Sequence, residues 1–499
     1  MLKTITYSDV QKIVFSFRNW RVRINLKRRI MEEDFEFGTP EEQKFSVDRY
    51  EEMLRNEDQY FFDAKAFESI IDYYITNNDP IKALQVIEFA SAQHPFETLF
   101  LIKKAQLLAS TLQYEPALEA LSKAELLEPS EGDIYLIKGT ILSALQEHAL
   151  AEENFFKALK LSDAKDEVYY QIAGLYQMQG SYEKAISYLK KSLQANKDNQ
   201  DALYEIAFCY DVLEQQQESI QFYNQYIDTD PYSYAAWYNL GNAYHKLGDF
   251  GAAIDAYDYA ILINENFSSA YFNKGNALVN LDRYSEAIEV YKQTFEHETP
   301  NADTYCAIGE CYEKLELMDE ARQYYKKAVK LDSNQSDAWF GIGVTLDFEE
   351  RYFESLHFYK KALEIDDENP DYWFAIADAR YKLKQFDQSI EAYSKVVELN
   401  PTDAEAWLDY SSLLFEQTRL EEAIEVISEA IKCNPDEATL YYRMVAYMFA
   451  GGKYTEALSF LELALNVDPE KHYILFEYLP QLQGNQVIVD IIKKYTEGR

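Results

Sequence analysis

The feature that most constrains this sequence is a small residue that returns every 34 residues. If the stretch 234–267, YAAWYNLGNAYHKLGDFGAAIDAYDYAILINENF, is numbered from 1 to 34, position 20 is Ala253. A small side chain is needed where two helices approach closely, because a larger one would force them apart. When the frame is moved by 34 in both directions, position 20 is always Ala or Ser: Ala83, Ala117, Ala151, Ala185, Ser219, Ala253, Ala287, Ala321, Ser355, Ser389, Ala423 and Ala457.

Other positions of the frame predict two amphipathic helices in each repeat, with a turn at Gly248 and Asp249. Position 4 is always large and apolar or aromatic, and position 8 is mostly Gly or Ala. Pro recurs at position 32, where it ends the second helix before the next repeat begins. Position 7 departs from this apolar pattern where it is Lys104, Lys138 or Lys274.

The residues that define this spacing are Trp237 at position 4, Leu240 at 7, Gly241 at 8, Tyr244 at 11, Ala253 at 20, Tyr257 at 24 and Ala260 at 27. The spacing resembles the tetratricopeptide repeat, a helix-turn-helix unit of 34 residues. The resemblance, closest to long bacterial arrays of this kind, implies an all-α right-handed superhelical solenoid of about twelve units with capping helices. It also implies a non-enzymatic scaffold that binds other proteins through a repeated surface.

The twelve units extend over residues 64–471 and leave too little chain for a catalytic domain. Residues 31–63 are expected to form an N-terminal capping helix and its lead-in, with Val47, Tyr50 and Leu54 on one helical face. Asp63 is a candidate N-cap for the first repeat.

Residues 472–499 are expected to form C-terminal capping helices, because the end of an array would otherwise expose an apolar face. The alternative is a helix that binds a partner. The apolar face of the last helix consists of Val487, Ile488, Ile491, Ile492 and Tyr495.

Residues 1–30 differ in character from the rest of the chain. They contain eight basic residues and one acidic residue, Asp9, whereas the whole chain has a net charge of −38. One interpretation is an extension upstream of Met31 that is disordered or not part of the mature chain. The alternative is a basic arm, including Arg21 and Arg23, that contacts anionic lipid or nucleic acid.

The composition argues against several classes of protein. With 86 acidic and 48 basic residues, the surface repels phosphate backbones, so nucleic acid is not expected as a direct partner. The four cysteines show no CxxC spacing and no signal-like run follows Met1, which together predict a cytoplasmic protein. No apolar run is long enough to span a membrane.

The sequence predicts no enzyme, no metal site and no cofactor. The six histidines are scattered without metal-ligand spacing, and no phosphate-binding loop or nucleophile motif is present. Cys306 and Cys311, five residues apart on one predicted helix, are expected to be small buried hydrophobic residues.

Position 5, which in the tetratricopeptide family points into the concave groove, is aromatic in most repeats from Tyr170 onward. The ladder is interrupted at Cys306 and Leu408. Such rings could instead serve only to pack neighbouring helices. Amides and carboxylates at positions 9 and 12 complete an expected acidic groove for a protein segment with basic and apolar residues. The candidate groove residues are Tyr170, Tyr204, Tyr238, Phe272, Phe340, Phe374, Asn242, Asn276, Asp211, Glu310, Asp347 and Asp378.

One family activity is not expected. Co-chaperones of this family grip a C-terminal carboxylate with two Asn residues and three basic residues. Asn242 and Asn276 match the two Asn positions, but Tyr238, Asp303 and Ala307 replace the basic residues. A self-assembling or regulatory subunit that acts through its convex surface is the alternative to a groove-binding scaffold.

Overall fold

A computed structural model describes residues 40–56 and 60–496 of the chain. These residues form helices joined by short turns and contain no strand, which confirms the predicted all-α class. The chain divides into two compact units, Met1–Gly248 and Asp249–Arg499. The division falls at the turn inside the repeat 234–267.

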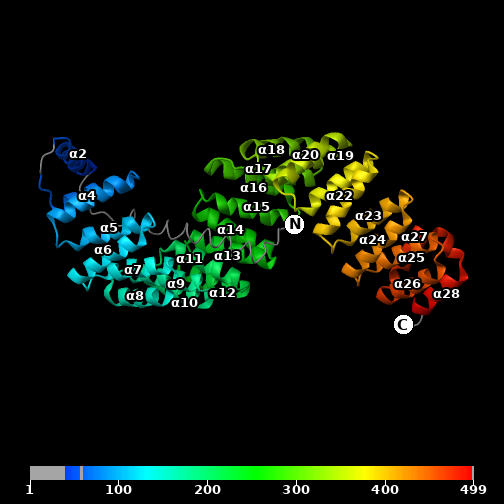
Figure 1. Cartoon of the computed structure of the whole chain (residues 1–499), viewed down its shortest axis with the longest axis horizontal. Helices are drawn as coiled ribbons and strands as arrows, with labels where there is room; N and C mark the ends of the chain where they lie inside the picture. Colours follow the sequence, from blue (N-terminus) through cyan, green and yellow to red (C-terminus); the bar gives the residue numbers. More distant parts are fainter. Residues whose placement is uncertain (1–39, 57–59, 497–499) are drawn as a thin grey trace. The chain divides into compact units, whose positions relative to one another are not determined.

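The described part of the first unit starts with α2 (Pro40–Asn56) and continues as pairs made of a first and a second helix (Figure 1). The pairs are α3 (Ala64–Thr76) with α4 (Pro80–Gln93), α5 (Thr98–Ser110) with α6 (Tyr114–Leu127), α7 (Gly132–Ala144) with α8 (His148–Leu161), α9 (Lys165–Met178) with α10 (Tyr182–Ala195), and α11 (Gln200–Val212) with α12 (Gln216–Thr229). The first helix α13 (Tyr234–Leu247) ends the unit.

The second unit begins with the second helix α14 (Phe250–Ile263). Its pairs are α15 (Ser268–Val279) with α16 (Tyr284–His297), α17 (Ala302–Lys314) with α18 (Met318–Leu331), α19 (Ser336–Phe348) with α20 (Tyr352–Ile365), α21 (Pro370–Lys382) with α22 (Phe386–Leu399), α23 (Ala404–Glu416) with α24 (Leu420–Cys433), and α25 (Ala438–Ala450) with α26 (Tyr454–Val467). The chain then forms η1 (Glu470–His472), α27 (Tyr473–Tyr478), η2 (Pro480–Gly484) and α28 (Gln486–Thr496).

In both units the first helices form the inner layer. Successive first helices pack on one another, as α5 does on α7 and α17 does on α19. Each second helix packs instead on the first helix of the next repeat and, where the two lie in the same unit, on its own first helix. The first helices thus lie where successive repeats contact one another through the same kind of helix, and we call the face that they line within each unit the concave face.

The small residues at position 20 hold the paired helices together. All twelve are at most 2% exposed, which confirms the frame derived from the sequence. At position 8, glycine makes room for a ring at position 24 of the same repeat. A Cβ on Gly343 would lie 2.4 Å from the Tyr359 ring, and one on Gly309 would lie 2.7 Å from the Tyr325 ring. Neither glycine can therefore carry a side chain unless the ring moves.

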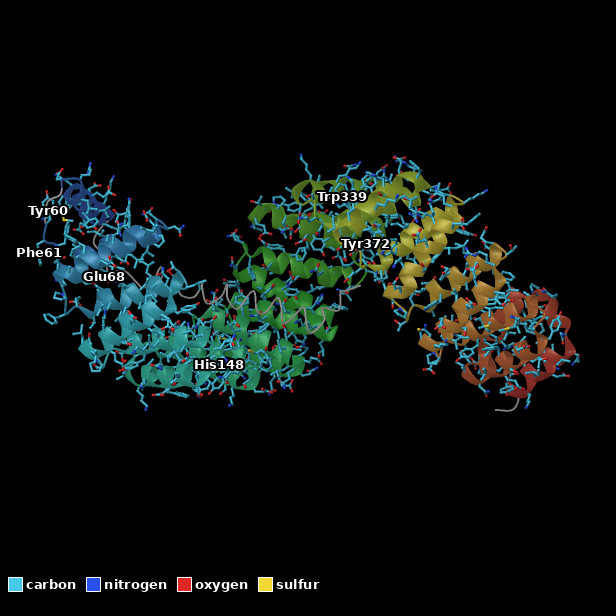
Figure 2. The ribbon with its side chains drawn as sticks, viewed as in Figure 1. Tyr60, Phe61, Glu68, His148, Trp339 and Tyr372 are labelled. Carbon is cyan, nitrogen blue, oxygen red and sulfur yellow. The ribbon has the colours of Figure 1, made fainter. Side chains whose placement is uncertain are left out.

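Position 4 connects each repeat to the one before it. The indole Nε1 of Trp339 donates a hydrogen bond to the carbonyl oxygen of Ser333, at 2.9 Å. Trp407 makes the same bond to Pro401, at 2.9 Å. Figure 2 labels Trp339 together with Tyr372, a buried tyrosine of the next repeat. The large side chain at position 4 thus fixes the loop that precedes its own helix.

The turn between paired helices contains a residue with positive φ at position 15 of every repeat. Three of these residues are glycines, Gly180, Gly248 and Gly452. The other nine hold the left-handed conformation with a side chain, at φ values from 55° to 64°, a region that such residues seldom occupy. They are Asn78, Leu112, Gln146, Glu214, Asp282, Glu316, Glu350, Lys384 and Thr418.

The N-terminal helix packs on the array through a slightly different face from the one predicted. Val47 and Tyr50 are buried as expected, but the third buried residue is Met53, and Leu54 is 53% exposed. The prediction for Leu54 is wrong because a helix at the end of an array has neighbours on one side only and buries a narrow stripe. Asp63 is the N-cap of α3, and its side chain accepts the backbone N–H of Ala66 at 2.8 Å.

The last helix, α28, packs on α26. Ile488 and Ile492 are buried in a core shared with Leu475 and Leu482, and Ile491 and Tyr495 pack against that core. Val487 is 58% exposed, so the expected apolar face is buried only in part. Residues 1–30, for which the sequence leaves two interpretations, lie outside the described residues.

A buried ion pair joins the first two repeats on the inner side. Lys103 Nζ lies 2.9 Å from Asp72 Oδ1 and 3.6 Å from Glu68 Oε1. The side chains of Lys103 and Asp72 are only 6% and 4% exposed. In an ion pair shielded from water, each charge compensates the other, so removal of one partner would leave an uncompensated buried charge.

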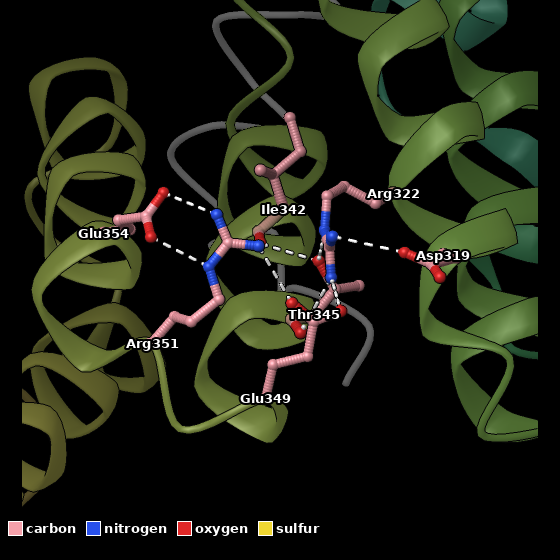
Figure 3. Close-up of polar contacts among 7 residues, drawn as sticks. All are labelled: Asp319, Arg322, Ile342, Thr345, Glu349, Arg351 and Glu354. Atoms are coloured by element: carbon pink, nitrogen blue, oxygen red, sulfur yellow. Dashed lines mark hydrogen bonds and ion pairs between the residues drawn. The ribbon is translucent and has the colours of Figure 1, made fainter.

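On the outer side of the second unit, two arginines connect α18, α19 and α20 (Figure 3). Arg322 Nε donates to Thr345 Oγ1 at 2.9 Å, and its guanidinium also contacts Glu349. Arg351 pairs with both oxygens of Glu354 and with Glu349. Glu349 therefore couples the two arginines and ties neighbouring repeats together.

Candidate binding face

The aromatic ladder lies on the first helices and is half-buried. In the first unit its members are Tyr170 on α9, Tyr204 on α11 and Tyr238 on α13. The rings of Tyr204 and Tyr238 meet edge to face, with centroids 6.3 Å apart. Burial raises the pKa of the Tyr204 hydroxyl above its ordinary value. These two rings from consecutive repeats therefore form one continuous aromatic surface.

In the second unit the ladder rings lean on buried tyrosines at position 24. Phe272 on α15 lies 5.5 Å from the Tyr291 ring, and Phe374 on α21 lies 5.6 Å from the Tyr393 ring. Phe340 on α19 lies 5.3 Å from the ring of Tyr359 at position 24 and 4.8 Å from the buried ring of Tyr372 on the next first helix, α21. These rings contribute to packing, yet each stays only partly buried. Both expected roles of the ladder are therefore compatible with the contacts.

The two asparagines at position 9 are Asn276 and Asn242. Asn276 Oδ1 accepts a hydrogen bond from the buried hydroxyl of Tyr291, at 2.6 Å. This contact gives Asn276 a structural role within its own repeat. Asn242 on α13 is half-buried at the equivalent position.

The interruption of the ladder at α17 is acidic. Cys306 is buried, as is Cys311, in agreement with the expectation for both thiols. The Cys306 Sγ lies 3.6 Å from Glu310 Oε1. The residue Glu310 is exposed, yet neighbouring protein atoms displace part of the water around its carboxyl group. This desolvation raises the pKa of that group.

Lysines at position 13 pair with groove carboxylates of the repeat before and, in one case, also of their own repeat. Lys246 lies 2.6 Å from Asp211 in the first unit. In the second unit Lys382 lies 3.3 Å from Asp347 and 2.7 Å from Asp378. One lysine therefore serves two of the predicted groove carboxylates, and the site keeps a net negative charge.

Desolvation raises the pKa of four carboxyl groups of the second unit, and all four lie on its first helices. They are Glu310, Glu313, Asp347 and Asp409. Glu313 also accepts the Tyr325 hydroxyl at 2.8 Å, which opposes its shift. Lys382 opposes the shift of Asp347 in the same way. The inner face of the second unit is thus short of positive charge.

The structure brings some predicted groove residues together and adds others. Asp347 and Asp378 meet at one lysine, and Tyr204 meets Tyr238. Lys246 and Lys382 were not anticipated, although their spacing of 35 residues from Asp211 and Asp347 repeats in the sequence. Asp409, at position 6, was also missed because that position has no constant character: it is Ala375 in the repeat before and Arg443 in the repeat after.

Removal of two of these carboxylates should stabilise the second unit near pH 7. A carboxyl group whose pKa is raised in the folded state binds its proton more tightly there than in the unfolded chain, so stability falls as pH rises from the ordinary pKa through the raised one. The double variant Glu310→Gln, Asp409→Asn should melt a few degrees higher than the wild type at pH 7, with the difference shrinking towards pH 4. Thermal melts of the full chain across this range give the measurement.

A matched control replaces Glu364 and Glu425, exposed carboxylates of the second helices, by Gln. This control should leave the melting temperature nearly unchanged at every pH. Carboxyl groups with a lowered pKa have the opposite effect on the pH dependence of stability; one is Glu349, whose pKa is held below its ordinary value by a hydrogen bond from Arg322. Because these groups are unchanged in every variant, they cancel when the variants are compared. A groove variant that melts at or below the wild-type temperature at pH 7 would contradict the desolvation argument.

No group of His, Cys, Asp and Glu side chains among residues 40–56 and 60–496 is arranged to hold a metal ion. Over the same residues, no helix combines the length and the apolar character that crossing a bilayer requires.

Comparison with protein-family models gives one consistent result. Models described as tetratricopeptide repeat match residues 176–231, 234–267, 268–296, 302–335, 336–369 and 374–438. Together these segments account for half of the chain. They share the 34-residue frame that the burial pattern supports. No curated protein matches the chain.

Solved structures of repeat proteins are also similar to parts of the chain. YrrB, described as a TPR protein with an unusual peptide-binding site, is 22% identical, covers 37% of this chain and 95% of its own, and has a TM-score of 0.31. MamA is 30% identical, with 32% of this chain and 95% of its own covered, at a TM-score of 0.30. The Cut9–Hcn1 hetero-tetramer of APC/C matches at 14% identity, with 91% of this chain and 99% of that chain covered, at a TM-score of 0.40.

Proposed function

The chain belongs to the tetratricopeptide repeat family, and we propose that it is a non-enzymatic scaffold that binds a polypeptide segment of another protein on the concave face of its first helices. The observation that supports this proposal most is the combination of partly exposed rings with an excess of carboxylates on that face. Rings and carboxylates without a nucleophile, metal site or cofactor motif suit recognition and not catalysis.

The chemistry of the face favours one class of ligand. A half-buried ring offers a π surface to a cation and to apolar groups, and a neighbouring carboxylate supplies the countercharge. A segment with basic and apolar residues would gain from each repeat that it crosses. The proposed contact residues are Tyr170, Tyr204, Tyr238, Phe272, Phe340, Phe374, Asn242, Asn276, Asp211, Glu310, Asp347 and Asp378.

Loss of three ladder rings should greatly weaken capture of such a segment. Replacement of Tyr204, Tyr238 and Phe272 together by Ala should cost about 1 to 2 kcal/mol of binding free energy per ring, as interface anchors do. The partner is first captured from a native host extract by crosslinking and pull-down, and its affinity for wild-type and variant chains is then measured by calorimetry.

The matched control removes three strongly exposed outer rings, Tyr232, Phe353 and Tyr454. This variant should bind as the wild type does. Thermal stability must be measured beside binding, because Phe272 also packs on Tyr291. Full capture by a correctly folded triple groove variant would refute the proposal and direct attention to the convex surface.

The convex surface is the weaker candidate. Its strongly exposed apolar residues, such as Leu126, Leu262 and Phe353, come singly from different second helices. Isolated exposed apolar residues are normal on a protein surface and do not form a contiguous patch. Self-assembly through this face would appear as concentration-dependent oligomers that are indifferent to the groove variants.

A further inference from the structure

A small open cavity lies between α2 and the segment that leads into α3. Its volume is about 210 Å³. None of the proposed contact residues of the concave face lines it. We call it the end pocket, and its walls are formed by Phe45, Ser46 and Arg49 of α2 and by Phe61, Phe62 and Asp63 of the lead-in.

Hydrogen bonds from the end of α4 fix the lead-in wall of the end pocket. The Gln93 side chain donates to the carbonyl oxygen of Tyr60 at 2.7 Å and accepts the backbone N–H of Phe62 at 3.2 Å. His94 Nε2 lies 2.8 Å from the carbonyl oxygen of Phe62. The backbone is therefore held on both sides of Phe61, so this wall is formed before any ligand arrives, as in most binding sites.

Two large apolar side chains of the end pocket remain exposed to water. Phe45 is 67% exposed and Phe61 is 68% exposed. Figure 2 labels Phe61 and its neighbour Tyr60. Because both phenylalanines line one cavity, they differ from the isolated apolar residues of the second helices. Exposed apolar surface gathered around a cavity is typical of a binding site.

The guanidinium of Arg49 is the charged group of the end pocket that seeks a partner. Its Cζ lies 5.2 Å from the centroid of the Phe62 ring and 5.6 Å from that of Tyr60. Over the described ranges 40–56 and 60–496, no carboxylate forms an ion pair with it. A guanidinium placed over rings keeps N–H groups for a planar acceptor, and a carboxylate matches their geometry best.

The other polar side chains of the end pocket are already engaged. Asp63 caps α3 and accepts the backbone N–H of Ala66 at 2.8 Å, where the positive end of the helix balances its charge. The Ser46 hydroxyl donates to the carbonyl oxygen of Glu42 at 3.1 Å. Arg49 therefore decides which charge the end pocket attracts, and it attracts an anion.

The size of the end pocket limits what can enter it. Sites for whole small molecules start at about 300 Å³, whereas a cavity of about 150 Å³ can hold benzene. About 210 Å³ therefore suits one aromatic or large aliphatic side chain. We propose that the end pocket binds a segment of a partner protein that inserts one such side chain beside Phe45 and Phe61 and pairs an adjacent carboxylate with Arg49. This second site prefers acidic segments, whereas the concave face is proposed to take basic ones.

A labelled peptide with one phenylalanine flanked by two aspartates is the probe for this site. Its affinity for the full chain is measured by fluorescence anisotropy. Arg49→Gln should weaken binding about tenfold, because a hydrogen bond between two charged groups is lost. The control Arg55→Gln removes an exposed arginine of the same helix that does not line the end pocket, and it should bind as the wild type does. Equal weakening in both variants would overturn the proposal.

Reversal of the probe's charge tests the role assigned to Arg49. A peptide with two lysines in place of the aspartates should bind the wild type at least tenfold more weakly than the probe does. Arg49→Gln should not weaken this second peptide further. Equal affinity of the wild type for both peptides would overturn the proposal.

Filling the cavity tests the inserted side chain. Ala66 of α3 lines the end pocket and is half-buried. Ala66→Leu should abolish probe binding by occupying the space, and a thermal melt verifies that the variant is folded. Full binding by the folded variant would overturn the proposal. If the variant does not fold, Arg49→Gln still decides, because Arg49 is exposed.

Photocrosslinking locates the probe and separates it from another occupant. A probe with benzoylphenylalanine in place of phenylalanine should label residues 45–49 and 60–66, as mapped by mass spectrometry. Labels confined to the first helices α5, α7, α9, α11 and α13 would overturn the proposal. Concentration-dependent self-association of the full chain that Arg49→Gln abolishes would also overturn it, because the occupant would then be a second copy of the chain.

Discussion

Replacement of Lys103 by Met is expected to destabilise the first unit by about 3 to 5 kcal/mol. The side chain of Lys103 is 6% exposed and lies 2.9 Å from Asp72, whose side chain is 4% exposed. Methionine is similar in length but leaves the buried carboxylate without this counter-ion, and a buried charge that loses its partner costs far more than the pair contributes. Urea denaturation of the full chain, followed by hydrogen exchange at α3 and α5, measures the loss.

The neighbouring lysine provides the control. Lys104 pairs with Glu88 at 3.3 Å, but its side chain is 31% exposed and that of Glu88 is 66% exposed. Lys104→Met should therefore cost less than about 1 kcal/mol. The double variant Lys103→Met, Asp72→Leu should recover most of the stability lost in the single variant, because the dry carboxylate is gone and Glu68, the other carboxylate beside Lys103, is 24% exposed. A small loss in Lys103→Met would show that water reaches Asp72 readily.

Replacement of Ala151 by Leu is expected to destabilise the third repeat by about 1 to 3 kcal/mol. Ala151, at position 20 on α8, is fully buried against its paired helix. A leucine there must push α7 and α8 apart, and in a linear array the damage is confined to neighbouring repeats. Hydrogen exchange should therefore rise in α7 and α8 before it rises in α3.

The same helix offers a control two residues away. Ala149 is exposed in the first turn of α8. Ala149→Leu has the same change of volume and should alter stability by no more than about 0.5 kcal/mol. If both variants melt alike, the assignment of position 20 to the helix contact is wrong.

The periodic features of the fold could be predicted from the sequence because each arises from a contact that recurs along the array. The small residue at position 20 and the glycine at position 8 follow from close approach, as Gly343 and Tyr359 show. Single departures were harder to interpret. The lysines at position 7 weaken the apolar pattern, yet Lys104, Lys138 and Lys274 each pair with a carboxylate of the preceding second helix. Charge pairs between repeats replace apolar packing there.

The ends of the array were less predictable. A helical face derived from spacing alone does not specify how wide a stripe the neighbour covers, so Leu54 and Val487 are exposed where burial was expected. A repeat inside the array has neighbours on both sides, and its burial follows from the frame. A terminal helix has a neighbour on one side only, and the sequence does not encode that asymmetry.

The chemistry of the binding face could be predicted only in part. The ladder positions and the acidic character follow from the frame, as in Phe340 and Glu310. The contacts of each side chain do not, because they depend on the neighbouring repeat. Lys382 reaches back to Asp347 across 35 residues, and Asn276 holds the Tyr291 hydroxyl instead of facing the groove alone. Whether these residues bind a partner stays a prediction.

The left-handed turn residues imply that this array can be adapted to hotter surroundings. Nine of the twelve turns hold a side chain at a backbone conformation that costs about 1 kcal/mol or more compared with glycine. Exchange of Leu112 or Lys384 for Gly or Asn would remove that cost while leaving groove positions 5, 9 and 12 untouched. Because neighbouring turns lie a full repeat apart, such gains should add almost independently. The protein can therefore gain heat tolerance one turn at a time, without any change in what its inner face recognises.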